Sequence, residues 1–192
     1  MAIRVKMKSL LHPTDPVAIG TPDYSSFEGQ TMWVGAPVEY TEMPVEAGSF
    51  IAAQLQCTPE FRDWGTLGVI NIYGPEIMPS SVYDVQEIHI DCTPSLNVEL
   101  AYSDPLVVPT AHWGDVVAPF AGDPGNTLPV DFNDISACVQ KFLGDPSQTM
   151  VRMKLSPGML DLTSEVDFRD IAGSVEGFLN EPYTLDGPRV CP

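Results

Sequence analysis

The sequence predicts a mainly β protein, in which a seven-stranded antiparallel β-sandwich over residues 1–111 is followed by a small helical domain over residues 112–192. Short segments of alternating apolar and polar residues, separated by turns rich in proline and glycine, fill the first part of the chain. Convincing helical periodicity occurs only in the second part, and there it occurs twice. The 19 prolines and 15 glycines leave room for few long helices, whereas a hydrophobic content of 44% is enough to build a core.

The predicted strands follow one another at short intervals. They are expected near residues 2–9, 30–34, 50–56, 68–73, 83–91, 97–101 and 105–110. The first has the pattern of a half-buried strand, because Ile3, Val5 and Met7 alternate with basic residues. In the fifth, Tyr83 is expected to face the core and Gln86 to face water.

Two helices are predicted from a duplicated segment. The sequence from Val130 to Leu143 returns 36 residues later, from Val166 to Leu179, with eight positions matching in register. Each copy places an apolar stripe at i, i+4, i+7 and i+8, formed by Ile135, Val139, Phe142 and Leu143 in the first copy and by Ile171, Val175, Phe178 and Leu179 in the second. One short helix cannot bury such a stripe, so the two helices are expected to pack on each other.

Glycines set the expected limits of these helices. Gly144, followed by Pro146, is expected to end the first helix. Gly173 and Gly177 are expected to weaken the second, because each costs about 1 kcal/mol relative to alanine inside a helix.

The charge of the chain narrows the classes of partner. Twenty-six acidic residues against nine basic ones give a net charge of −17, and no cluster of lysines or arginines is present. A nucleic acid or an anionic membrane surface is therefore not an expected partner. No apolar run approaches the ~20 residues that span a bilayer, so no membrane insertion is predicted. The chain opens directly in a strand, which suggests a piece of a longer protein.

The four cysteines predict two disulfides. They lie far apart in an acidic, lysine-poor chain without a C-x-x-C motif, so they favour disulfides in an oxidising compartment over a zinc site. The predicted pairs are Cys57–Cys92 and Cys138–Cys191, because each pair lies within one predicted domain. The alternative is a set of four buried thiols in a cytosolic protein.

The duplicated segment resembles a type I dockerin over about residues 113–180. The resemblance rests on Gly114-Asp115-Val116, on Val130-Asp131 with Asp134-Ile135, and on Val166-Asp167 with Asp170-Ile171. Dockerins are small extracellular modules with two calcium loops of EF-hand type, each followed by a helix, and many bind cohesin domains. The resemblance therefore implies Ca²⁺ as a bound ion and a cohesin-like protein as a partner.

The same resemblance assigns calcium ligands. These would be Asp115, Asp131 and Asp134 in the first loop and Asp167 and Asp170 in the second. In the second loop Lys154 stands where the first aspartate is expected. Asp134 and Asp170 have a second interpretation, in which they cap free N–H groups at the start of each helix and offset the helix dipole. The sequence leaves both interpretations open.

The first part of the chain resembles a fibronectin type III or similar immunoglobulin-like sandwich. The resemblance rests on Trp33 in an early strand, Leu55-Gln56-Cys57 in a middle strand and Tyr83-Asp84-Val85 in a late one. The sequence contains no G-x-S-x-G, no H-E-x-x-H and no P-loop, so no catalytic residue is predicted.

The predicted function is that of an extracellular or cell-surface, non-catalytic module for protein–protein attachment. One alternative is a structural subunit of an extracellular fibre, which assembles when the N-terminal strand pairs with the sheet edge of a neighbouring subunit. A second is a carbohydrate-binding appendage in which an exposed Trp64 stacks on a sugar.

Overall fold

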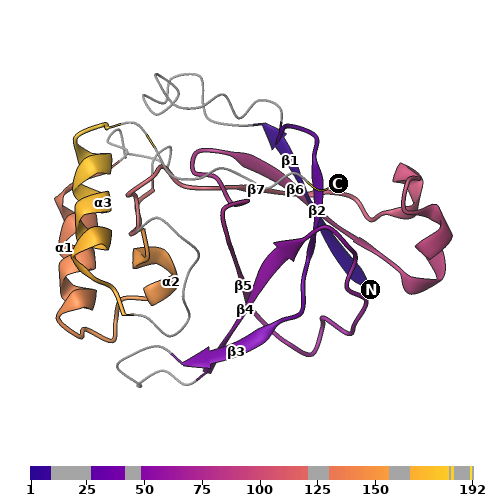
Figure 1. Cartoon of the computed structure of the whole chain (residues 1–192), viewed down its shortest axis with the longest axis horizontal. Helices are drawn as coiled ribbons and strands as arrows, with labels where there is room; N and C mark the ends of the chain where they lie inside the picture. The colour runs from indigo at the N-terminus through magenta and orange to yellow at the C-terminus, as the bar shows by residue number, and fades with distance from the viewer. Residues whose placement is uncertain are drawn as a thin grey trace.

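The computed structural model describes residues 1–9, 27–41, 49–120, 130–155, 165–181, 183 and 191. A curled, mainly antiparallel sheet lies beside a group of helices (Figure 1). The strands are β1 (Ala2–Ser9), β2 (Thr31–Val34), β3 (Val38–Thr41), β4 (Ser49–Gln56), β5 (Ile70–Tyr73), β6 (Val82–Ile88) and β7 (Leu106–Pro109). The α-helices are α1 (Phe132–Phe142), α2 (Met150–Met153) and α3 (Phe168–Phe178). The prediction of a mainly β protein is confirmed.

The sheet curls at β4. The strand order is β3-β4-β2-β1-β6-β7, and β5 pairs with β4 outside this path. The pair β4–β5 is parallel and the other pairs are antiparallel. The first part of β4 pairs with β3 and β5, whereas its last residues, Leu55 and Gln56, pair with β2. The N-terminal strand β1 lies in the interior of the sheet, between β2 and β6.

The elements differ from the prediction in several places: α2 was not predicted, and the strand predicted at 83–91 ends at Ile88. Strand β3 was not predicted, and the strand predicted at 97–101 is wrong. There the chain forms two short 3-10 helices, Ile90–Ser95 and Glu99–Ala101. The first begins where His89 Nδ1 accepts the Asp91 N–H, and it contains Pro94, which cannot donate to a strand ladder.

Both faces of the sheet are covered. Inside the curl lies the larger apolar core, formed by Val5, Met7, Met32, Val34, Ala53, Leu55, Trp64, Met78, Tyr83, Trp113 and Tyr183. On the other face Ala2, Trp33 and Ile88 pack under the segment of 3-10 helices. This covering segment explains why Gln86 is buried and not exposed as predicted. Its Oε1 accepts a hydrogen bond from Arg4 Nη2 (2.7 Å), and the Arg4 guanidinium lies 3.4 Å from the ring centroid of Tyr102.

The helices and the sheet share a second apolar core. Tyr40 and Ala52 from β3 and β4 pack with Cys138 of α1 and with Met150 and Met153 of α2. Trp113, from just after the predicted domain boundary, lies in the first core. The helical part is therefore packed onto one side of the sheet and is continuous with its interior. None of the described helices is long and apolar enough to cross a bilayer.

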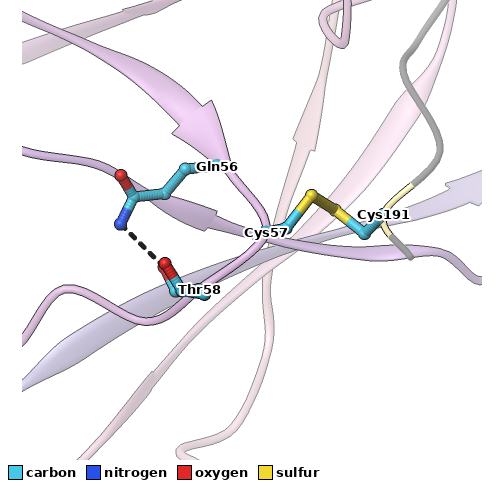
Figure 2. The surroundings of a disulfide bond; sticks show 4 residues. All are labelled: Gln56, Cys57, Thr58 and Cys191. Carbon is cyan, nitrogen blue, oxygen red and sulfur yellow. Dashed lines mark hydrogen bonds between the residues drawn. A yellow bond between two sulfur atoms is a disulfide. The ribbon is translucent and has the colours of Figure 1, made fainter.

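A disulfide joins Cys57, at the end of β4, to Cys191, near the end of the chain (Figure 2). The two Cα atoms are 5.3 Å apart, and Cys92 and Cys138 are free thiols. The predicted pairs Cys57–Cys92 and Cys138–Cys191 are therefore wrong. The reason is that the chain returns to the sheet after α3, while Cys138 is enclosed on the inner face of α1, with its Sγ 3.7 Å from Met153 Sδ.

Candidate functional site

Each of the two long helices starts with the same aspartate pair. At α1, the Asp131 carboxylate accepts the N–H of Asn133 (2.6 Å), and Asp134 Oδ2 accepts the N–H of Asp131 (2.8 Å). At α3, Asp167 accepts the N–H of Arg169 (2.7 Å), and Asp170 Oδ2 accepts the N–H of Asp167 (2.8 Å). Both helices therefore begin with a capping box, which satisfies N–H groups that have no partner inside the helix.

The second aspartate of each pair is buried and binds an earlier segment of chain. Asp134 Oδ1 accepts the N–H groups of Val116 (2.9 Å) and Val117 (3.0 Å). Asp170 Oδ1 accepts the N–H of Leu155 (2.8 Å). These carboxylates therefore hydrogen-bond the start of each helix to the segment of chain before the preceding loop, at Val116–Val117 for α1 and at Leu155 for α3.

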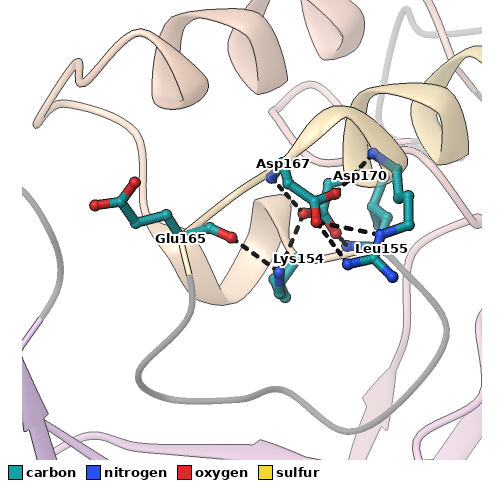
Figure 3. Close-up of polar contacts among 6 residues, drawn as sticks. Lys154, Leu155, Glu165, Asp167 and Asp170 are labelled. Carbon is teal, nitrogen blue, oxygen red and sulfur yellow. Dashed lines mark hydrogen bonds and ion pairs between the residues drawn. The ribbon is translucent and has the colours of Figure 1, made fainter.

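Lys154 adds a positive charge at the start of α3 (Figure 3). Its Nζ lies 3.3 Å from Asp170 Oδ2 and 2.9 Å from the carbonyl oxygen of Glu165. The side chains of Lys154 and Asp170 are 8% and 0% exposed, so this ion pair is shielded from water. A buried carboxylate is stabilised by such a partner, because an uncompensated buried charge is costly.

The structure brings the predicted calcium ligands together in pairs, Asp131 with Asp134 and Asp167 with Asp170. All four carboxylates accept N–H groups at the helix starts; for Asp134 and Asp170 this is the capping that the sequence allows as a second interpretation, whereas Asp131 and Asp167 were predicted only as calcium ligands. Asp115 is buried, and the next residue, Val116, donates to Asp134. Among the residues that the structure describes, no group of three or more His, Cys, Asp or Glu side chains is arranged to hold a metal ion. Much of both loops, at 121–129 and 156–164, lies outside the described residues. Calcium binding therefore stays a prediction.

Trp64 is not available for stacking on a sugar. Only 6% of it is exposed, its Nε1 donates to the carbonyl oxygen of Met1 (2.8 Å), and the Arg62 guanidinium lies 5.5 Å from the ring centroid. The expectation of an exposed Trp64 is wrong, because the N-terminus of the chain folds over it. Met1 and Arg62 also exchange two backbone hydrogen bonds.

The helices α1 and α3 pack antiparallel through two equivalent pairs of phenylalanines. The ring centroids of Phe132 and Phe178 are 4.9 Å apart, and those of Phe142 and Phe168 are 4.7 Å apart. Phe132 corresponds to Phe168 in the repeat, and Phe142 to Phe178, so an approximate two-fold axis relates the helices. The prediction that the helices pack on each other is confirmed. The reciprocal pairing could have been read from the repeat, because each copy carries a phenylalanine near both ends of its helix.

Part of each apolar stripe is exposed, together with the phenylalanine at the start of each helix. Phe132 is 74% exposed and Phe168 is 73% exposed, and Leu143 and Leu179 are exposed as well. We call this surface the helix-pair face; it consists of Phe132, Phe142, Leu143, Phe168, Phe178 and Leu179. The buried sides of the helices carry small residues instead, among them Ala137 on α1 and Gly173, Ser174 and Gly177 on α3.

Cys138 has no reactive character. Burial raises the pKa of its thiol to about 12, so the nucleophilic thiolate is scarce at neutral pH. Of the histidines, His112 is buried, whereas His89 is exposed at the start of a 3-10 helix; His12 lies outside the described residues.

Comparisons with protein-family models, with curated proteins and with solved structures found no match for the chain. Its function must therefore be inferred from its own geometry.

Proposed function

We propose that the chain is an extracellular, non-catalytic protein–protein binding module whose helix-pair face binds the partner. The observation that carries this proposal is the exposure of Phe132 and Phe168 at equivalent positions of two antiparallel helices. Large apolar side chains grouped on the surface of a soluble protein are typical of an interaction site. Phenylalanine loses little conformational entropy on binding, since it has only two side-chain torsions, and the ring pairs restrict these further.

The resemblances are part of the proposal. A duplicated dockerin-like unit is expected to give two antiparallel helices related by a two-fold axis, and α1 and α3 have this arrangement. A fibronectin- or immunoglobulin-like sandwich in the first part of the chain and calcium in the first of the two loops belong to the same proposal. The disulfide Cys57–Cys191 supports an oxidising, extracellular compartment.

The charge near the helix-pair face indicates the chemistry of the partner. Acidic residues lie within two positions of five of its six apolar side chains: Asp131 beside Phe132, Asp145 after Leu143, Asp167 beside Phe168, Glu176 before Phe178 and Glu181 after Leu179. On α3 the residue after Phe168, Arg169, is basic, and its guanidinium is paired with the Asp167 carboxylate. A partner with an apolar centre and a basic rim would match this pattern.

The alternative of a fibre subunit is less favoured. The strand on which it depends, β1, is already paired on both sides within its own chain. The free edge at β7 is a poor substitute. The N–H of Thr110 donates to the carbonyl oxygen of Ser81, so the backbone N–H groups of Val108 and Leu106, two and four residues earlier, also point towards β6. The outward positions of β7 alternate with these, and one of them is Pro109, which has no N–H to donate to a neighbouring strand.

The experiment uses the double variant Phe132→Ser/Phe168→Ser in the full chain. Both side chains are largely exposed, so the variant is expected to fold. Wild type and variant, each immobilised, are incubated with the extracellular proteins of the source organism; the captured proteins are identified by mass spectrometry, and their affinities are measured with purified material. We expect the double variant to weaken binding of the partner at least about thirtyfold, as for loss of an interface hot spot.

The matched control is Leu100→Ser. Leu100 is 96% exposed but lies in the 3-10 segment, at the end of the molecule remote from α1 and α3 (Figure 1). It is expected to bind like wild type. A partner held equally by the wild type and the Phe132/Phe168 variant would contradict the proposal.

A further inference from the structure

The starts of α1 and α3 share the same capping box, but they differ in charge. Asp134 and Asp170 occupy the same position in the repeat, and each accepts the N–H of its own N-cap aspartate. Each also accepts N–H groups from the preceding segment: those of Val116 and Val117 in the first copy, and that of Leu155 in the second. The residues just before these donors are Asp115 and Lys154, so the structure places an aspartate and a lysine at equivalent points.

The lysine reaches the buried carboxylate. Its ammonium binds Asp170 Oδ2 and the Glu165 carbonyl oxygen, two oxygens of the kind that a calcium ion would require (Figure 3). Lys154 offers only N–H donors and no lone pair, so it cannot itself ligate a metal. A divalent ion in contact with Asp170 would also lie beside the buried ammonium and would be repelled by it.

We infer that the Lys154 ammonium occupies the position beside Asp170 and the Glu165 carbonyl oxygen where a metal ion would bind in the second loop–helix unit, and that this unit binds no metal there. The residues at the start of α3 do not fit the calcium ion that the dockerin resemblance implies. The two halves of the repeat therefore differ: the start of α3 is held by an internal ion pair, whereas the first unit carries Asp115 at the equivalent point. Phe168, the first residue of α3, is accordingly positioned without any metal.

The experiment measures amide hydrogen exchange of the full chain in the absence of any partner. The reporters are the N–H groups of Leu155 and Asp167, since both donate to Asp170. Wild type is measured in EDTA and in millimolar calcium chloride. Because no partner is used, the result is independent of whether the helix-pair face binds one.

Two variants accompany the wild type. Lys154→Met removes the ammonium and keeps much of the side-chain volume. Lys8→Met is the matched control, since Lys8 Nζ lies 3.4 Å from Asp84 Oδ1 in a similar but exposed pair. We expect Lys154→Met to speed exchange at Leu155 and Asp167 at least about tenfold, and Lys8→Met to leave both unchanged.

For wild type we expect both reporters to be equally protected in EDTA and in calcium. Reporters that exchange rapidly in EDTA and become protected only with calcium would overturn the inference, as would unchanged exchange in a folded Lys154→Met. If Lys154→Met does not fold, which exchange of the β1 amides would reveal, the two wild-type conditions decide the question alone.

Discussion

Burial fixes the chemistry of single residues in this protein, and the two free cysteines illustrate it. Cys138 is fully buried on the inner side of α1, whereas Cys92 is only partly buried in a 3-10 helix. Desolvation disfavours a thiolate, and it raises the pKa of Cys138 from an ordinary value of 9.0 to about 12. The thiol therefore behaves as a small apolar side chain.

This shift predicts an alkaline loss of stability. Since the pKa is higher in the folded than in the unfolded state, the unfolded chain loses the proton first. The contribution of the protonated Cys138 thiol to the free energy of unfolding is therefore complete below about pH 9, and it is lost as the pH rises from 9 towards 12. Between pH 8.5 and 10, the free energy of unfolding of wild type is expected to fall by about 1 kcal/mol more than that of Cys138→Ala.

Urea denaturation at each pH measures this difference. A Cys92→Ser background in both proteins removes the other free thiol, and non-reducing electrophoresis after each measurement checks that Cys138 has not exchanged with the Cys57–Cys191 disulfide. The range ends at pH 10, because the pKa of Tyr83 is also raised above its ordinary value of 10.0 by burial. Parallel pH profiles for the two proteins would show that Cys138 does not titrate as described.

Among the secondary-structure elements, the contrast between α1 and α3 is the most informative. From the sequence alone, Gly173 and Gly177 are expected to destabilise α3, because glycine has a low helix propensity. In the structure Gly177 allows the backbone of Trp113 and Gly114 to lie directly against the helix, and Gly173 makes room for the side chain of Leu155. A Cβ on Gly177 would lie 2.5 Å from the Trp113 carbonyl oxygen, and Gly114 adopts a φ of +87°, which favours glycine.

The expected effect of Gly177→Ala is therefore the reverse of its helix propensity. Propensity alone would stabilise the protein by about 1 kcal/mol, but the clash is with backbone and cannot be relieved by a side-chain rotation. We expect a loss of at least about 2 kcal/mol in chemical denaturation. Ser136→Ala, at an exposed site of α1, is the control and should change stability by less than about 0.5 kcal/mol. Stabilisation by Gly177→Ala would refute the close approach.

At the scale of the whole molecule, the described residues at the end of the chain, Tyr183 and Cys191, contact the first core and the end of β4. After α3 the chain passes Tyr183, whose ring packs against Trp113 in the first core, and reaches Cys191 beside β4. The disulfide thus joins residues that are 134 positions apart in the sequence. Together with the two shared cores, it connects the two predicted units.

Removing this disulfide is expected to destabilise the whole chain. The chain-entropy estimate for a loop of this length is about 5 kcal/mol, which is an upper value because native strain and residual structure reduce it. Cys191→Ser and Cys57→Ser should each lower the urea midpoint by a similar amount. Cys92→Ser should leave it nearly unchanged, and a non-reducing peptide map should recover a fragment that links residues 57 and 191. A linked fragment containing Cys92 would contradict this pairing.

Local patterns determined the elements that need only neighbouring residues. The alternation of Ile3, Val5 and Met7 predicts β1, and the repeat predicts α1 and α3, because strand pleat and helix period both act over a few residues. Gly144 ends α1 as predicted, with a φ of +91°. The packing of the two helices on each other also follows from the matching stripes.

Only the tertiary structure decided which cysteines pair, that Trp64 is buried and which side of each helix is buried. Cys57 meets Cys191, and the N-terminus covers Trp64, through contacts between distant parts of the chain that no local spacing encodes. The stripe with the most apolar residues was expected inside, yet the small residues Gly173 and Gly177 let the opposite side of α3 approach the backbone more closely. Close packing therefore selected the buried side, and the phenylalanines were left on the surface.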